Sequence, residues 1–213
     1  MTQHTPCAVL TGDLIKSRQS GTAAVDKTFD ILHQAAKAFG AAHDLDLRFT
    51  RHRGDGWQIV LMQPGLLLDA ALYFVARLKA GEAQIATRLS IGVGPVDSLG
   101  SRDLSDATGP AFFVSGNNLG QMGRNRMLTL AGQGIGVAQV AILDLAEWIA
   151  SGWTATQAEA VAIHLEGHLI RHEDIAKTLG VTRQAIQNRL SGAGLSYFDN
   201  ALYAMRHHNY VSE

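Results

Sequence analysis

The 213-residue sequence contains little cysteine, little proline and little charge. Its single cysteine, Cys7, excludes an internal disulfide, so we expect a reducing, cytoplasmic setting and a buried apolar position for Cys7. Charged residues make up 17% of the chain and apolar residues 46%, which excludes an intrinsically disordered protein. The net charge of −1 excludes a general attraction to phosphate backbones, so any nucleic-acid binding has to be local.

Long hydrophobic runs are also lacking. The apolar stretches 66–68 and 70–76 are separated by Asp69 and stopped by Arg77, well short of the ~20 residues of a membrane span. The first residues lack the basic start and apolar core of a secretory signal. We therefore expect no membrane partner.

Two kinds of hydrophobic periodicity divide the chain. Up to about residue 133, short apolar or alternating runs predict strands at 6–10, 47–52, 57–62, 86–93 and 126–130. Between them, apolar residues at three- and four-residue steps predict helices at 22–42, 67–79 and 111–122. After the glycine-rich run 132–136 only helical spacing remains, which predicts an α+β domain followed by an all-α one. We expect domains at 1–133 and 154–213, joined by a linker helix at 134–153.

The stretch from Ile175 to Leu190 has the pattern of a helix-turn-helix. Small Ala176 allows two helices to cross closely, Gly180 suits the tight turn, and the Thr182 hydroxyl can cap the second helix. Apolar residues then hold that helix on the core, and its polar residues face outward. The outward set, which includes no carboxylate, is Arg183, Gln184, Gln187, Asn188 and Arg189.

These side chains suit the major groove of double-stranded DNA, because Arg pairs with guanine edges and Gln or Asn with adenine edges. Residues 153–167 resemble the first helix of sigma-factor region four and related helix-turn-helix families. The alternative is an ordinary helical hairpin with a solvated polar face. Nearby acidic residues such as Glu173 and Asp174 weaken phosphate attraction, so we expect DNA binding by a homodimer. The segment 196–207 could pair with a second copy or pack on its own domain.

Two aspartates stand out in the N-terminal part. Asp13 follows the first predicted strand, and Asp55 lies at the tip of the predicted hairpin. If the hairpin lies beside the first strand, the two carboxylates sit about 5 Å apart at neighbouring strand ends. Mg²⁺ would suit that place together with nucleotide phosphates. The alternative is plain turn chemistry, because Gly-Asp and Asp-Gly are common in turns.

Four sequence blocks together resemble the SatD family, which pairs a cyclase-like domain with a C-terminal helix-turn-helix in some members. They are Thr11-Gly-Asp-Leu-Ile-Lys-Ser-Arg18, Arg53-Gly-Asp-Gly-Trp-Gln58, Arg88-Leu-Ser-Ile-Gly-Val-Gly-Pro95 and Gly109-Pro-Ala-Phe112. More distantly, the blocks are similar to class III nucleotide cyclases and diguanylate cyclases. The resemblance implies a ferredoxin-like, cyclase-type palm followed by the helix-turn-helix, with Asp13 and Asp55 as metal ligands.

The sequence departs from the cyclase pattern at two places. Gly56 and Trp57 follow the hairpin aspartate, where diguanylate cyclases have an acidic residue, and residues 113–115 lack the Asn and Arg of class III adenylate cyclases. Because an Arg fork suits phosphate oxygens, three arginines near the aspartates are candidate nucleotide ligands. They are Arg18, Arg53 and Arg88.

Two functions follow from these patterns. The first is a transcriptional regulator whose palm binds a nucleotide, without catalysis, and adjusts DNA binding. The second is a nucleotidyl cyclase or related nucleotidyltransferase that uses Mg²⁺ at Asp13 and Asp55.

Overall fold

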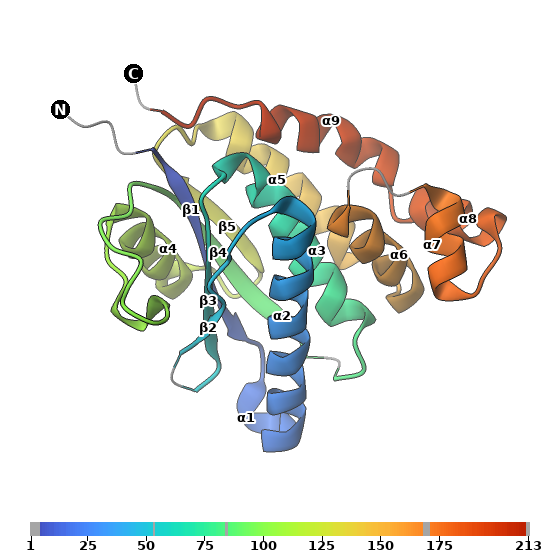
Figure 1. The fold of residues 1–213 in the computed structure, drawn as a ribbon, viewed down its shortest axis with the longest axis horizontal. Coiled ribbons are helices and arrows are strands. Elements are labelled where there is room, and N and C mark those ends of the chain that lie inside the picture. The colour runs from blue at the N-terminus through green and yellow to red at the C-terminus, as the bar shows by residue number, and fades with distance from the viewer. Residues whose placement is uncertain (1–4, 53, 84, 168–170, 212–213) are drawn as a thin grey trace.

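A five-stranded sheet forms the centre of the computed structural model, which describes residues 5–52, 54–83, 85–167 and 171–211 (Figure 1). In sheet order the strands are β2 (Thr50–Arg51), β3 (Gly56–Leu61), β1 (Cys7–Leu14), β4 (Thr87–Gly94) and β5 (Leu128–Gly132). Neighbouring strands are antiparallel except β4 and β5, which are parallel. The predicted alternation of strands and helices is confirmed, and the fold is α+β with a palm-like sheet.

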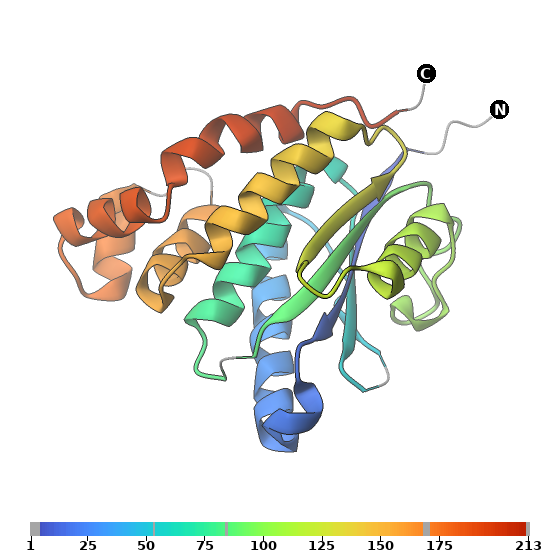
Figure 2. The ribbon, with the colours of Figure 1, turned by 180° about the vertical axis from the view of Figure 1, so that it is seen from behind.

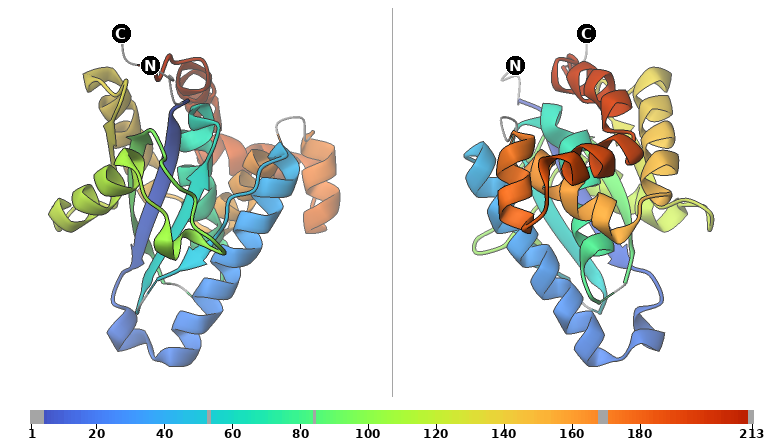
Figure 3. Two further views of the ribbon diagram at one scale, coloured as in Figure 1. Left: turned by 60° about the vertical axis from the view of Figure 1, so that its left-hand side comes forward. Right: turned by 90° about the vertical axis from the view of Figure 1, so that its right-hand side faces the viewer.

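Helices cover both faces of this sheet (Figure 3). One face carries α2 (Thr22–His43) and α3 (Leu67–Ala80), preceded by the single turn α1 (Ser17–Ser20) and the 3-10 turn η1 (Pro64–Leu66). The other face carries α4 (Pro110–Gln121) and the 3-10 turn η2 (Leu104–Asp106). Side chains alternate along each strand, so one set joins the large core under α2 and α3. The opposite set joins a small second cluster that includes the buried Cys7, Val9 and Val60.

After β5 the described part of the chain is helical (Figure 2). The helices are α5 (Val137–Ser151), α6 (Ala155–Glu166), α7 (His172–Leu179), α8 (Arg183–Gly192) and α9 (Leu195–Arg206). Helix α6 packs along α3, and α5 and α9 also contact α3. As a result α3 lies between the sheet and the C-terminal helices, and its Asp69 is fully buried in an ion pair with Arg206 of α9. Within the described ranges, no helix is long and apolar enough to cross a bilayer.

The large core runs without a break from the sheet into the C-terminal helices. Trp153, which precedes α6, is 3% exposed and packs edge-on against Phe198 of α9, with ring centroids 5.8 Å apart. The glycine-rich run 132–136 is held to the sheet, because the Gln133 backbone NH donates to the Val93 carbonyl at 2.9 Å. The division into domains therefore stays a prediction, and the apolar packing crosses both proposed boundaries.

The first strand is longer than predicted. Thr11, Gly12 and Asp13 continue β1, whereas the sequence predicted a turn there. Glycine is required at position 12 because a β-carbon would lie 2.4 Å from the Trp57 ring of the neighbouring strand. The Gly-Asp pair therefore belongs to a strand, and the turn interpretation of Asp13 is wrong.

Candidate functional site

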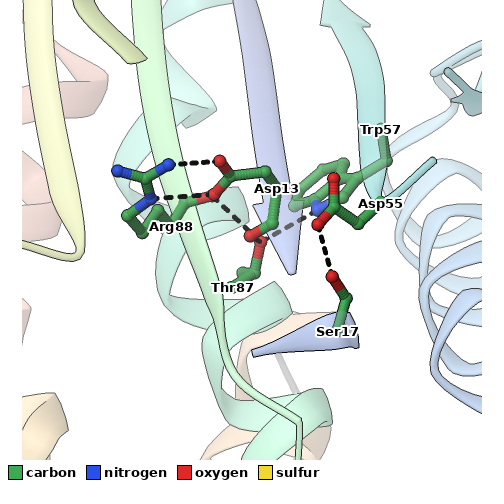
Figure 4. Close-up of polar contacts among 6 residues, drawn as sticks. All are labelled: Asp13, Ser17, Asp55, Trp57, Thr87 and Arg88. Carbon is green, nitrogen blue, oxygen red and sulfur yellow. Dashed lines mark hydrogen bonds and ion pairs between the residues drawn. The ribbon is translucent and has the colours of Figure 1, made fainter. Parts of the chain in front are cut away.

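Three strands present polar residues at one end of the sheet. In the register of the sheet, Asp13 of β1 lies opposite Gly56 of β3 on one side and Arg88 of β4 on the other. Asp55 directly precedes β3, so it reaches the same end (Figure 4). The expectation that the hairpin lies beside the first strand, with both aspartates at neighbouring strand ends, is confirmed.

Asp13 forms a two-pronged ion pair with Arg88. The Arg88 Nε donates to Asp13 Oδ1 at 2.9 Å, and Nη2 donates to Oδ2. The pair is accessible, with 24% of the Asp13 side chain and 34% of the Arg88 side chain exposed. The hydrogen bonds to Asp13 raise the pKa of Arg88, the charges of Asp13 and Asp55 raise it further, and burial opposes both. Arg88 is therefore a permanent cation beside two carboxylates.

Asp55 is held from a different side. Its Oδ2 accepts a hydrogen bond from Ser17 Oγ at 2.5 Å, and its backbone carbonyl accepts one from the Leu14 NH at 3.0 Å. Figure 4 shows the Asp55 carboxylate directed toward Ser17 and the Asp13 carboxylate directed toward Arg88. Both carboxylates thus occupy the same strand ends with separate protein partners.

Two buried side chains, Thr87 and Trp57, hold the backbone of Asp13 in place through hydrogen bonds. Thr87 Oγ1 donates to the Asp13 carbonyl at 2.8 Å and accepts from the Trp57 indole NH at 3.0 Å. Trp57 is fully buried and Thr87 is 1% exposed. The sequence analysis missed Ser17, Thr87 and the role of Trp57. Only the strand register, which places Asp13 between β3 and β4, would have indicated the last two.

A second polar row continues along the α4 face of the same strands. Thr11 Oγ1 and Ser115 Oγ are 2.8 Å apart, Gln58 Nε2 donates to Thr11 Oγ1 at 2.8 Å, and His52 Nε2 lies 2.9 Å from Gln58 Oε1. This row joins α4 to β1, to β3 and to His52, which directly follows β2. The sequence analysis gave it no role, because its members are far apart along the chain.

The candidate arginines have different outcomes. Arg88 lies in the site. Arg18 lies on α1 and is exposed, and no contact between it and either aspartate is found among the described residues. Arg53 lies outside the described residues. Of the proposed phosphate ligands, Arg88 alone is brought to the aspartates by the described part of the fold.

The donor set fits a hard divalent cation of the Mg²⁺ type. Two carboxylates at adjacent strand ends are what such an ion takes from protein when substrate phosphates and water complete its shell. No cluster of three or more His, Cys, Asp or Glu residues with metal-binding geometry occurs in the described ranges. One ion shared by Asp13 and Asp55 would require Asp13 to leave Arg88 and Asp55 to leave Ser17.

A cavity of about 290 Å³ opens at the same end of the sheet, on the α3 side. Thr87 lines it, so the cavity and the Asp13 site share one residue. The remaining lining residues come from α3, β4, β5, α5 and their adjoining loops, and most are apolar: Val75, Leu78, Lys79, Ile85, Ala86, Met127, Leu128, Glu147, Ala150 and Ser151.

The C-terminal pattern forms the predicted helix pair. Gly180 ends α7 in the left-handed conformation with φ 63°, and Thr182 caps α8 by accepting the Ala185 backbone NH at 3.1 Å. Ala176, Ile186 and Leu190 are buried. On the outer side Thr182, Arg183, Gln184, Gln187 and Asn188 are exposed.

Arg189 is the exception, and its outward placement was wrong. Its side chain is 22% exposed and its Nη1 donates to Glu159 Oε2 of α6 at 3.0 Å. Arg183 also has a partner, Glu173, but that pair is exposed on both sides and contributes only about 0–1 kcal/mol. Arg183 can therefore leave Glu173 at little cost, whereas Arg189 is part of the helix packing.

No model of a known protein family matches the sequence. No curated protein matches it either. Among solved structures, the active GGEEF domain of a diguanylate cyclase from Vibrio cholerae is 20% identical, with a TM-score of 0.39, covering 59% of this chain and 83% of that one. A bacterial light-regulated adenylyl cyclase is 17% identical, with a TM-score of 0.43, covering 71% of this chain and 82% of that one.

Proposed function

We propose that this chain acts on nucleoside triphosphates at the Asp13 end of the sheet, as a nucleotidyl cyclase or related nucleotidyltransferase. The observation that carries the proposal is that Asp13, Asp55 and Arg88 lie at or directly beside the ends of three adjacent strands.

The chain's residues have separate tasks in this proposal. A bound Mg²⁺ would neutralise phosphate charge and activate the attacking hydroxyl. Asp13 and Asp55 would hold it, and Arg88, released from Asp13, would pair with phosphate oxygens through its planar fork. A ribose hydroxyl oxygen would then bond to the α-phosphorus and lose its proton to water, while the bond between the α-phosphorus and the bridging oxygen to the β-phosphate breaks and pyrophosphate leaves.

Pyrophosphate release tests this proposal. Purified protein is incubated with each nucleoside triphosphate and Mg²⁺ or Mn²⁺, and its melting temperature is measured with the same ligands. Asp13→Asn should abolish both pyrophosphate release and the nucleotide-dependent rise in melting temperature. Asp30→Asn, which changes an exposed aspartate of α2, is the matched control. A wild-type protein that neither releases pyrophosphate nor is stabilised by any triphosphate would rule the proposal out.

A second candidate function, binding of double-stranded DNA, is favoured by the exposed polar side of α8. A tight turn separates α8 from α7, and the polar residues of α8 and its cap are exposed. They are Thr182, Arg183, Gln184, Gln187 and Asn188. A helix that exposes guanidinium and amide groups suits base edges in the major groove. The resemblance to the SatD family, with its C-terminal helix-turn-helix in some members, supports the same candidate. On this view the palm would sense a nucleotide and adjust DNA binding.

Fluorescence anisotropy with labelled duplex DNA at low salt tests this second candidate. The double variant Arg183→Ala with Gln187→Ala should lose binding, and added salt should weaken binding of the wild type. Gln121→Ala with Arg124→Ala removes the same chemistry from exposed positions at the end of α4 and serves as the control. Equal binding by both double variants would exclude α8 as the reading helix.

A further inference from the structure

Helix α5 exposes an apolar stripe along its whole length. Val137, Ala141, Leu145 and Trp148 follow one another at steps of four, four and three residues, so they lie on one face of the helix. Val137 is 87% exposed, Leu145 66% and Trp148 76%. The opposite face is already buried in the core through Leu143, Ala146 and Ala150. The stripe is therefore a second apolar face, unpartnered among the described residues.

Helix α9 extends this face on one side. It runs antiparallel to α5 (Figure 2). After the end of α9, His208 Nε2 lies 2.6 Å from the carbonyl of Gly134, which precedes α5. Before the start of α9, a β-carbon on Gly194 would lie 3.3 Å from Ile149, near the end of α5. Tyr197, 77% exposed, borders the same glycine. We call the joint surface the α5–α9 platform: Val137, Ala141, Leu145, Trp148, Tyr197 and the exposed Ala204.

The size of the platform fits a protein interface. Its two aromatic side chains alone contribute roughly 300 Å², since each presents about 150–250 Å² and is three-quarters exposed. The aliphatic residues extend the patch over the ~22 Å length of α5. Monomers rarely expose apolar patches of several hundred Å² outside interaction sites. With a polar rim, such a centre approaches the ~800 Å² per partner of a stable complex.

The charges of α5 favour a protein partner over a membrane surface. The helix has no Lys or Arg, and its two acids, Asp144 and Glu147, both pair with Arg126 beside the stripe. Interfacial membrane helices carry basic residues on their polar face to meet lipid phosphates. The stripe itself is uncharged, so it can face a copy of itself without bringing like charges together.

We propose that the occupant is a second copy of this chain, with α5 packed antiparallel on α5 about a twofold axis between Ala141 and Leu145. In that register Trp148 lies over the second copy's Val137, and Leu145 lies over its Ala141. Each large side chain then meets a smaller one, and both contacts occur twice, as an isologous interface requires. Steps of four and three residues are those by which helix surfaces interlock.

Sedimentation equilibrium and tryptophan quenching test the interface. Trp57 and Trp153 are buried, so acrylamide quenching reports Trp148. We expect a dimer whose quenching falls as protein concentration rises. Ala141→Arg places a charged side chain over the second copy's Leu145, in an apolar interface. It should therefore raise the dimer dissociation constant at least ~100-fold. Phe113→Arg, at a 74% exposed position on α4, should leave it unchanged. Circular dichroism checks that both variants are folded.

Cysteine crosslinking tests the register. In a Cys7→Ser background, a mixture of Val137→Cys and Trp148→Cys proteins should form a disulfide-linked heterodimer, and neither protein alone should crosslink well. A wild type that is monomeric at all concentrations would overturn the proposal, even if it sediments with lipid vesicles or captures another protein. So would a dimer that Ala141→Arg leaves intact. These outcomes are independent of nucleotide turnover.

Discussion

The hydroxyl of Thr87 connects the Trp57 indole to the backbone of Asp13, and the side chains of Thr87 and Trp57 are buried. We expect Thr87→Val to lower the free energy of unfolding by about 1–3 kcal/mol, because the indole NH would be left without an acceptor away from water. Urea unfolding followed by circular dichroism measures the loss. Thr87→Ser keeps the hydroxyl, and a serine variant as unstable as the valine variant would contradict this account.

The two partners of the ion pair between Asp69 and Arg206 are buried to different extents. The Asp69 side chain is fully buried, whereas 31% of the Arg206 side chain is exposed. Arg206→Met would leave a buried carboxylate without its cation, so we expect a loss of about 3–5 kcal/mol in urea unfolding. Asp69→Asn leaves a guanidinium that can reach water, and the loss should be smaller. Equal losses from both variants would show that the burial of Asp69 is not the dominant cost.

The ionisation of Tyr73 makes the free energy of unfolding depend on pH in the alkaline range. Its hydroxyl donates to Glu166 Oε2 at 3.0 Å, and burial, followed by the charge of Glu166, raises the pKa of Tyr73. The stabilisation is complete below the unfolded-state pKa of ~10 and is lost as pH rises, because only the unfolded state ionises readily there. Tyr73→Phe should therefore flatten the fall in stability above pH ~10 by up to about 1.4 kcal/mol per pH unit. Urea unfolding at a series of pH values measures the slope; an unchanged slope would contradict the assignment.

At the scale of single elements, two glycines of the β4 and α4 pair should respond in opposite directions. A β-carbon on Gly92 would lie 2.4 Å from the Ala111 carbonyl oxygen and 2.5 Å from the Ser115 nitrogen, so Gly92→Ala should force α4 away from the sheet. Such overpacking costs typically ~1–3 kcal/mol. Gly116, on the open side of α4, has no such neighbour within 4 Å, so Gly116→Ala should stabilise by about 0.5–1 kcal/mol. Melting curves of both variants compare the two directions.

Helices were predicted more closely than strands. The expected ranges 22–42 and 67–79 match α2 and α3 to within one residue, because their apolar stripes extend to both helix ends. The strands β1 and β5 differ by several residues, since strand ends are set by pairing with distant neighbours. Residues 47–49, predicted as strand, precede the short β2.

The candidate sites were predictable only in part. Asp13 and Asp55 could be placed together because each lies at the end of a strand that has a recognisable neighbour. Thr87 could not, since its role depends on pairing across the sheet, and Ser17 could not, since its contact with Asp55 depends on the position of α1. Arg189 was placed outward from its helical position alone, and its contact with Glu159 of α6 required the packing of the two helices.

At the scale of the whole molecule, the continuous core predicts that the chain unfolds as one unit. Trp57 reports on the sheet and Trp153 on the C-terminal helices, and both are buried. Two variants that both carry Trp148→Phe are compared, one with Trp57 and the other with Trp153 as its single remaining tryptophan. We expect their urea unfolding transitions to have the same midpoint. Separate midpoints would indicate two domains that unfold independently, as the sequence pattern alone suggested.

The helices α3 and α6 pack closely along a region rich in buried alanines, with Ala70, Ala71 and Ala76 on α3 and Ala158, Ala160 and Ala162 on α6. Small side chains let two helix backbones approach, so enlarging one of them would have to be offset by shrinking its neighbour on the other helix. Divergent versions of this chain should therefore show paired size changes between the two helices. Helices α3 and α6 would then evolve as a coupled unit, and neither would be readily exchanged for a counterpart from another protein.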